Sequence, residues 1–295
     1  MKQKKKHLLA SKQGRYGYIF CAPWIIGLLI YVAYPFYEAV HISFSKLTVG
    51  ESGYLLDGIG FSNYKYAFGV HPQFTKYLIS SFGNMFYQVP LVVIFSFFLA
   101  SVVNMDFKGR GIVRSVLFLP VIITSGSLNG LLTSDYMSQM ESGSSGTQLA
   151  AAFLNTVKDF DFPDVLVSFL AQSVGKIYEI TCMSAVPIVI FLAALQSISD
   201  SVYEAAYIEG ASAWEVFWKI KFPLVSPHIL VCVVYCIIDN LNTSSNPVVS
   251  TIKDTTYGAF EYGYGAAMSV AYMLIILLVL GIVYRIISKL VVYSE

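Results

Sequence analysis

The sequence predicts an all-α polytopic membrane protein with six transmembrane helices and one helical cytosolic loop between the fourth and the fifth. Three observations predict this fold class. Of the 295 residues, 56% are hydrophobic and only 13% are charged, whereas soluble domains carry about 25% charged residues. Several apolar stretches are long enough to cross a bilayer, which takes about 20 residues of helix. Lys and Arg gather in alternate connecting segments, as they do in cytoplasmic loops.

Each predicted span is an apolar stretch bounded by polar or Gly-rich residues. A first transmembrane helix is expected over 17–45, with its most apolar part at about 17–40. The remaining spans are expected at about 82–104, 112–134, 174–198, 227–247 and 266–289. Glu179 and Asp239 interrupt the fourth and fifth spans, which therefore have the weakest apolar pattern.

The distribution of basic residues predicts that both termini lie in the cytoplasm. In this orientation the inner segments hold thirteen Lys and Arg and the outer segments hold six, which together account for all 19. The expected cytosolic parts include a basic tail, a loop and a short final tail, at 1–16, 199–226 and 290–295. The expected outer loops are 46–81 and 135–173.

The sequence carries no motif for catalysis. Its four Cys show neither metal-ligand nor disulfide-framework spacing, and its four His form no His-Glu-x-x-His helix. It also lacks a Gly-x-Ser-x-Gly elbow and a phosphate-binding Gly-x-x-x-x-Gly-Lys-Ser loop. We therefore expect no catalytic residue, no metal and no cofactor, and ATP hydrolysis only in a separate chain. The net charge of +1 gives no reason to expect nucleic acid as a partner.

The expected cytosolic loop is a polar, amphipathic insert between two long apolar stretches. Ser201–Glu204 and Ser212–Glu215 each fit a capping box, in which a Ser hydroxyl and a Glu carboxylate bind the free amides at a helix start. Gly210 suits the left-handed conformation that ends a helix, and Pro223 and Pro227 set off the fifth span. These signals predict two short helices joined by a Gly turn. The alternative, a helix pair lying on the bilayer surface, is usually richer in Lys and Arg.

This insert resembles the EAA loop of the membrane subunits of type I ABC importers. In that family the loop forms coupling helices that fit into a cleft of the ATPase subunit. The resemblance therefore implies an ATPase-coupling role for the residues that match it, which are Glu204, Ala205, Ala206, Glu209, Gly210, Ala211, Phe217 and Pro223. Glu209 stands where the family usually has Asp, a change that keeps the charge.

The resemblance extends over most of the chain except about 135–172. It includes residues of the first span, the first outer loop, the start of the third span and the start of the last span, among them Phe20, Pro23, Phe61, Asn63, Arg114, Pro120, Tyr262, Gly263 and Gly265. The pattern looks most like the maltose- and glycerol-3-phosphate-type sugar permeases. Asn246–Thr251 departs from it, because sugar permeases commonly have a Thr-x-Gly-Gly-Pro-like stretch there. This departure leaves a non-sugar solute open.

Polar residues within the spans are candidates for a substrate pathway, because ionisable groups there normally face a cavity or a partner. Asp239, Asn242, Thr243 and Asn246 are spaced to share one face of a helix. Such a stripe offers both donors and acceptors to sugar hydroxyls. Asn84 and Gln88 share a face of the second span in the same way. The alternative for both sets is a hydrogen-bonded seam between helices.

The resemblance implies a permease subunit of an ATP-driven, binding-protein-dependent importer in a bacterial cytoplasmic membrane, with a transmembrane domain over 82–289. The expected solute is an oligosaccharide or a related polyhydroxylated molecule. The implied partners are a second, homologous permease, ATP-binding cassette subunits, an extracytoplasmic solute-binding protein and membrane lipid. The alternative is a channel or membrane scaffold that works without nucleotide, which would not explain the pair of capped cytosolic helices.

Overall fold

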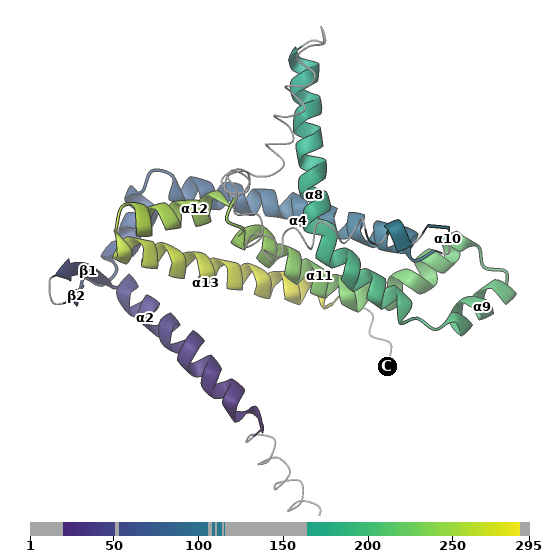
Figure 1. Cartoon of the computed structure of the whole chain (residues 1–295), viewed down its shortest axis with the longest axis horizontal. Coiled ribbons are helices and arrows are strands. Elements are labelled where there is room, and N and C mark those ends of the chain that lie inside the picture. Colours follow the sequence, from purple (N-terminus) through teal and green to yellow (C-terminus); the bar gives the residue numbers. More distant parts are fainter. Residues whose placement is uncertain are drawn as a thin grey trace, which may run out of the picture. The chain divides into compact units, whose positions relative to one another are not determined.

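Long apolar helices dominate the structure, as the sequence predicts. The computed structural model describes residues 20–50, 53–105, 108–109, 111–113, 115 and 164–289. Within these ranges, five helices are long and apolar enough to span a bilayer: Phe20–Ser43, Phe74–Val103, Gln172–Gln196, Ala213–Asn242 and Tyr262–Ile287. Figure 1 shows these helices together with a single two-stranded sheet in the described part of the chain. The all-α fold class is therefore confirmed.

Five of the predicted spans overlap observed helices, at the first, second, fourth, fifth and sixth positions. The second helix begins at Phe74, eight residues before the predicted boundary at 82, because a helix continues beyond the apolar stretch that the bilayer requires. The expected third span, 112–134, lies almost entirely outside the described residues. The predicted total of six spans therefore stays a prediction.

The fifth helix differs most from its predicted bounds of 227–247. Helix α10 (Ala213–Val216), the π-helical turn η3 (Phe217–Lys221) and α11 (Phe222–Asn242) form one continuous helix. The prolines expected to set off the span lie within it, one in the first turn of α11 and one further inside. Immediately before them the amide of Phe222 donates to the carbonyl of Phe217, and this wider turn relieves the crowding that a proline ring causes in a regular helix.

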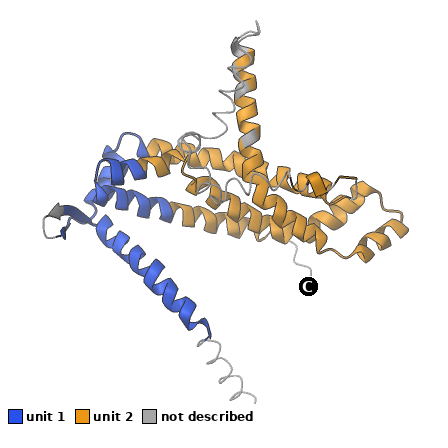
Figure 2. Cartoon of the chain, viewed as in Figure 1, with its two compact units in different colours: residues 1–74, 252–274 blue, residues 75–251, 275–295 orange. Residues whose placement is uncertain are grey.

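The chain divides into two compact units, which Figure 2 distinguishes by colour. Unit 1 contains residues 1–74 and 252–274, and unit 2 contains residues 75–251 and 275–295. The last helix, α13 (Tyr262–Ile287), contributes residues to both.

Unit 1 joins the first span to a small β-hairpin. Its elements are η1 (Leu29–Ala33), α2 (Tyr34–Ser43), β1 (Ser45–Gly50), β2 (Gly53–Gly58), α3 (Ser62–Lys65), η2 (Tyr66–Val70) and η4 (Asp254–Gly258). The strands pair antiparallel, with Ser45 opposite Gly58 and Gly50 opposite Gly53. The Tyr54 hydroxyl donates to Glu38 Oε1 at 3.3 Å, which ties the hairpin to α2. The expected outer loop 46–81 thus contains ordered structure.

The start of α13 lies very close to other parts of unit 1, and glycine makes this approach possible. Asn63 is 1% exposed and donates from Nδ2 to the carbonyls of Ser43 and Ser45, at 2.9 and 3.0 Å. A Cβ atom on Gly263 would lie 2.7 Å from the Ser45 carbonyl oxygen. Glycine at this position therefore allows the backbone of α13 to pack against the start of the hairpin.

Unit 2 is built on three long helices, α4 (Phe74–Val103), α8 (Asp164–Gln196) and α11, and also carries α9 (Asp200–Ile208) and most of α12 (Pro247–Lys253). Helices α8 and α11 pack directly on each other. Phe191 and Leu195 on α8 and Ile237 and Leu241 on α11 are almost completely buried. These large side chains supply the apolar burial that orders the described helices of this unit.

Candidate functional site

The turn between α9 and α10 depends on Gly210, as the sequence predicts. Gly210 has φ +81°, the left-handed conformation that side-chain-bearing residues rarely adopt. The amide of Ala211 donates to the carbonyl of Ala206 at 3.0 Å, and the amide of Gly210 donates to that of Tyr207 at 3.1 Å. This pair of bonds is the Schellman arrangement, which satisfies the last carbonyls of α9 and turns the chain sharply.

One of the two predicted capping boxes is confirmed. The Ser212 hydroxyl accepts from the Glu215 amide at 3.3 Å, and Glu215 Oε2 accepts from the Ser212 amide at 3.0 Å. Glu215 also forms an ion pair with Lys219 one turn later, at 3.0 Å. The carboxylate therefore joins the start of α10 to η3.

The other predicted box, Ser201–Glu204, is wrong. Helix α9 already begins at Asp200, with Ser199 in extended conformation at its N-cap. The Ser201 hydroxyl bonds to the Ser199 hydroxyl at 2.6 Å rather than to a backbone amide. Asp200 in the first turn instead places a negative charge near the free amides of the helix start, where the helix dipole favours it.

The helix pair presents apolar side chains to its surroundings. Ile208 is 86% exposed and Trp214 is 70% exposed, whereas Ala206 is buried. A shallow hollow of about 410 Å³ lies between the two helices, lined by Ala206, Glu209, Gly210, Ala211, Glu215, Lys219 and Ile220. Isolated surface hydrophobic residues are ordinary, but large apolar side chains beside a charged hollow are typical of a protein–protein contact.

Helix α9 is connected to the helix that follows by a cation–π contact. Lys221 Nζ lies 5.5 Å from the centroid of the Tyr203 ring. Burial raises the pKa of the Tyr203 hydroxyl, so this group is neutral at physiological pH. The contact spans from the first half of the loop to η3 and restricts how far α9 can move independently of α11.

An aromatic cluster connects the helix that follows the Gly210 turn to two other helices of unit 2. The ring of Phe97 on α4 lies 5.4 Å from Phe191 on α8 and 5.4 Å from Phe217 in η3, measured between centroids. The ring of Phe222 at the start of α11 is 6.0 Å from Phe97. Because close-packed side chains have low compressibility and transmit displacement, this cluster gives η3 a stiff contact with α4 and α8. The sequence shows no signal for it beyond ordinary apolar residues within the spans.

A polar cluster joins three helices within unit 2. The Asn240 amide on α11 donates to Gln88 Oε1 on α4 at 2.6 Å, and Gln88 Nε2 donates to Glu179 Oε1 on α8 at 3.3 Å. Asn240 is 9% exposed. The sequence predicts Gln88 as a candidate and Asp239 as the main polar group of the fifth span, but it does not single out Asn240. Asn240 follows Cys236 and Ile237 by four and three residues, so all three share one face of a helix. This spacing relative to two apolar residues is the sequence signal that could have placed Asn240 on the packed face.

The predicted polar stripe from Asp239 to Asn246 is not one helix face. Helix α11 ends at Asn242, because Thr243 takes an extended backbone with ψ 144°. Asp239, Asn242 and Thr243 are exposed in this chain, as is Asn84 on α4. These four side chains are therefore available to a pathway, and their role stays a prediction.

Asn246, the last member of that stripe, has a structural position instead. It is 6% exposed, and its Oδ1 accepts from the Ser81 hydroxyl at 3.0 Å and from the Val248 amide at 2.9 Å. Its Nδ2 donates to the Asn240 carbonyl at 3.3 Å. The side chain thus caps α12 and holds it to α4 and α11, which is the typical use of Asn at a helix start.

Comparison with known proteins gives relatives along almost the whole chain. The chain is 26% identical to the probable ABC transporter permease protein YesP of Bacillus subtilis (strain 168), over 99% of this chain and 96% of that protein. It is 24% identical to the trehalose/maltose transport system permease protein MalF of Thermococcus litoralis, over 91% and 92%. It is 26% identical to the arabinooligosaccharides transport system permease protein AraP of Bacillus subtilis, over 89% and 85%.

The fold is that of a solved transporter chain. A crystal structure of a bacterial ABC transporter involved in the import of the acidic polysaccharide alginate superposes with a TM-score of 0.61, at 18% identity, covering 96% of this chain and 99% of that one. The family model described as the inner membrane component of binding-protein-dependent transport systems matches residues 66–293. The chain therefore belongs to the family of inner membrane components of binding-protein-dependent transport systems.

Proposed function

We propose that this chain is the permease subunit of an ATP-driven importer for an oligosaccharide or a related polyhydroxylated solute. The observation that carries the proposal is the exposed helix pair α9–α10, which has large apolar side chains on its surface and continues directly into a membrane-spanning helix. A channel or scaffold that works without nucleotide has no need for such a pair. Family membership supports the transport role, and relatives named for oligosaccharide transport support the solute class.

The proposed mechanism is a rigid-body movement driven from the cytosol. Closure of partner ATPase subunits would push on the loop. The residues that would carry this role are Glu204, Ala205, Ala206, Glu209, Gly210, Ala211, Phe217 and Pro223. The helix from Ala213 to Asn242 is continuous, so a push on α10 acts along α11 as on a rod. The ring of Phe97 would pass part of the same displacement to α4 and α8.

The proposed topology follows from the distribution of basic residues. Both termini and the loop 199–226 would lie in the cytoplasm, and the hairpin of unit 1 would lie outside, where a solute-binding protein would dock. A second, homologous permease would complete the pathway, lining it opposite the exposed groups Asp239, Asn242, Thr243 and Asn84. Sugar hydroxyls both donate and accept hydrogen bonds, and these carboxylate, amide and hydroxyl groups match that chemistry.

Replacing Glu204 with lysine is expected to remove the ATPase from the complex while leaving the other subunits. Glu204 is exposed on α9, so reversing its charge changes the docking surface without disturbing a packed core. The test is a mild-detergent pull-down of the tagged chain, followed by mass spectrometry of the proteins that accompany it. We expect the wild type to carry a second permease, an ATPase and a binding protein, and the variant to retain about a tenth of the ATPase or less.

The matched control is Glu261→Lys, which reverses another exposed acidic residue on the side proposed to lie outside. This variant should keep the full amount of ATPase. Equal ATPase recovery with Glu204→Lys would contradict the proposed docking surface. Recovery of the wild-type chain alone, as a homo-oligomer, would favour the channel or scaffold.

Replacing Asp239 with alanine is expected to lower the uptake rate about tenfold or more at an unchanged level of assembled complex, which corresponds to about 1.4 kcal/mol. Its side chain is exposed in this chain, so we expect its loss to disturb the packing of the described helices little. Its neighbour Asn240 provides the comparison, because Asn240→Leu strips Gln88 of a buried hydrogen bond. That variant should lose abundance and thermal stability. If Asp239→Ala instead reduces only abundance, Asp239 belongs to a helix–helix seam.

A further inference from the structure

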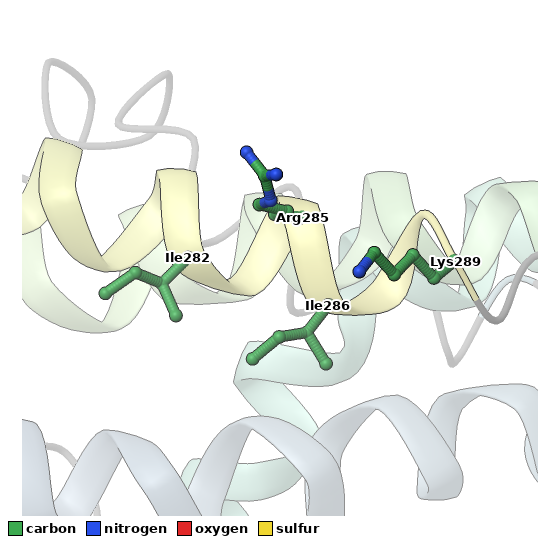
Figure 3. Close-up of a pocket in the computed structure, with 4 residues that line it drawn as sticks. All are labelled: Ile282, Arg285, Ile286 and Lys289. Carbon is green, nitrogen blue, oxygen red and sulfur yellow. The ribbon is translucent and has the colours of Figure 1, made fainter.

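The last turns of α13 carry a groove that the proposed transport mechanism does not use. It has a volume of about 370 Å³ and is lined by Ile282, Arg285, Ile286 and Lys289. Figure 3 shows the two isoleucines on one side of the helix, Arg285 rising from it, and Lys289 running back along the helix toward the turn that carries Arg285 and Ile286. Two cations and two branched apolar side chains therefore meet within two helical turns.

The two cations have no acidic partner in the described ranges. The ion pair found there joins Lys219 to Glu215, in a different part of unit 2. Arg285 and Lys289 are one turn apart, so a single anion can contact both. The guanidinium group of arginine offers parallel N–H donors that match a phosphate in a bidentate geometry, and lysine adds a point charge.

The apolar part of the groove continues along the membrane-spanning part of the helix. Leu278, Ile282 and Ile286 follow at intervals of four residues, and they are 61%, 51% and 58% exposed. This stripe leads from the apolar middle of the helix to the two cations near its end. A ligand that covers the whole surface must be apolar over most of its length and anionic at one end.

We propose that this groove binds an anionic phospholipid. Its phosphate pairs with Arg285 and Lys289, and one acyl chain lies along Ile282 and Leu278. A soluble protein partner would satisfy the charges but would leave the apolar stripe, which is continuous with the bilayer-facing helix, without a matching surface. Basic residues immediately beside a transmembrane helix typically attract the anionic headgroups of the adjacent lipids.

The test measures binding of dioleoylphosphatidylglycerol to the full-length chain, purified with the subunits that accompany it, by native mass spectrometry. The probe is compared with zwitterionic dioleoylphosphatidylcholine. In Arg285→Gln/Lys289→Gln we expect the affinity for phosphatidylglycerol to fall about tenfold or more, because each basic residue near the membrane surface contributes separately. The weaker binding of phosphatidylcholine should not change.

Two control variants separate a specific site from general charge. Arg285→Lys/Lys289→Arg keeps both cations in place and should retain phosphatidylglycerol. Lys65→Gln/Lys76→Gln removes two exposed lysines elsewhere and should also retain it. Wild-type affinity in the glutamine pair would overturn the proposal, and so would an equal loss in the Lys65/Lys76 variant. Displacement of the lipid by inorganic phosphate at the same concentration would overturn it too, because it would identify a simple anion site.

Discussion

Replacing Gly210 with valine is expected to abolish solute uptake while the protein remains in the membrane. Gly210 has φ +81°, and a β-branched residue in this conformation costs roughly 1–2 kcal/mol or more. No atom lies within 4 Å of the place that a Cβ atom would take at Gly210, so the strain acts through the backbone alone. The turn should open and move α9 away from α10. We expect uptake to fall more than tenfold, measured with labelled solute in membrane vesicles of matched protein content.

Gly210→Asn is the matched variant, because asparagine tolerates the left-handed conformation far better than other residues. It should retain most of the uptake. Gly83→Ala is a second control, since Gly83 has open space around it and an ordinary φ. Full uptake with Gly210→Val would show that the geometry of this turn has no part in coupling.

Replacing Gly265 with alanine is expected to prevent normal folding of unit 1. A Cβ atom at this position would lie 2.9 Å from Thr256 Cβ, closer than real Cβ contacts allow, and 3.2 Å from Thr256 Cα, which is tighter than most real contacts. Because Thr256 sits in η4 and also donates to the Ile252 carbonyl at 2.7 Å, it cannot simply turn away. Overpacking of this kind costs typically about 1–3 kcal/mol. The midpoint of thermal unfolding in detergent and the yield of membrane-inserted protein should both fall.

The control for this effect is Gly281→Ala in the same helix, where nothing lies within 4 Å of the added atom. It should be neutral or slightly stabilising, because alanine is the better helix former. Adding Thr256→Gly to Gly265→Ala removes the crowded side chain and should recover part of the lost stability. Wild-type unfolding in Gly265→Ala alone would mean that α13 can shift away from η4 at little cost.

Composition and apolar run length were enough to predict the class and the approximate position of most spans. The reason is physical: a bilayer demands about 20 apolar residues wherever a helix crosses it, whatever the protein does. Helix ends were less predictable. Helix α4 begins at Phe74, within residues expected to lie in an outer loop, since hydrogen bonding continues a helix beyond the bilayer. The predicted outer loop also gave no indication of the hairpin 45–58.

The turn between α9 and α10 was predictable because its signals are local. Gly210 and the Ser212–Glu215 box each depend on residues a few positions apart, so pattern alone identifies them. The polar cluster was not predictable in full, because the partners of Asn240 come from α4 and α8, far away in sequence. The role of Asn246 was not predictable for the same reason, because its partner Ser81 is far away in sequence. It also depends on the end of α11 at Asn242.

The π-helical turn η3 has a consequence for how this loop varies among related chains. A π turn holds one residue more than the regular helix it interrupts, and each residue of an α-helix turns the chain by about 100°. The number of residues between Ser212 and Pro223 therefore sets the angular direction in which α9 projects from the continuous helix that α10, η3 and α11 form. A related chain with one residue fewer between the positions of Ser212 and Pro223 would keep the same helices. Its hollow between α9 and α10 would nevertheless face a different side of the α11 axis. The length of this segment thus determines the direction in which α9 points. A deletion within the segment would change that direction, whereas a substitution would leave it unchanged.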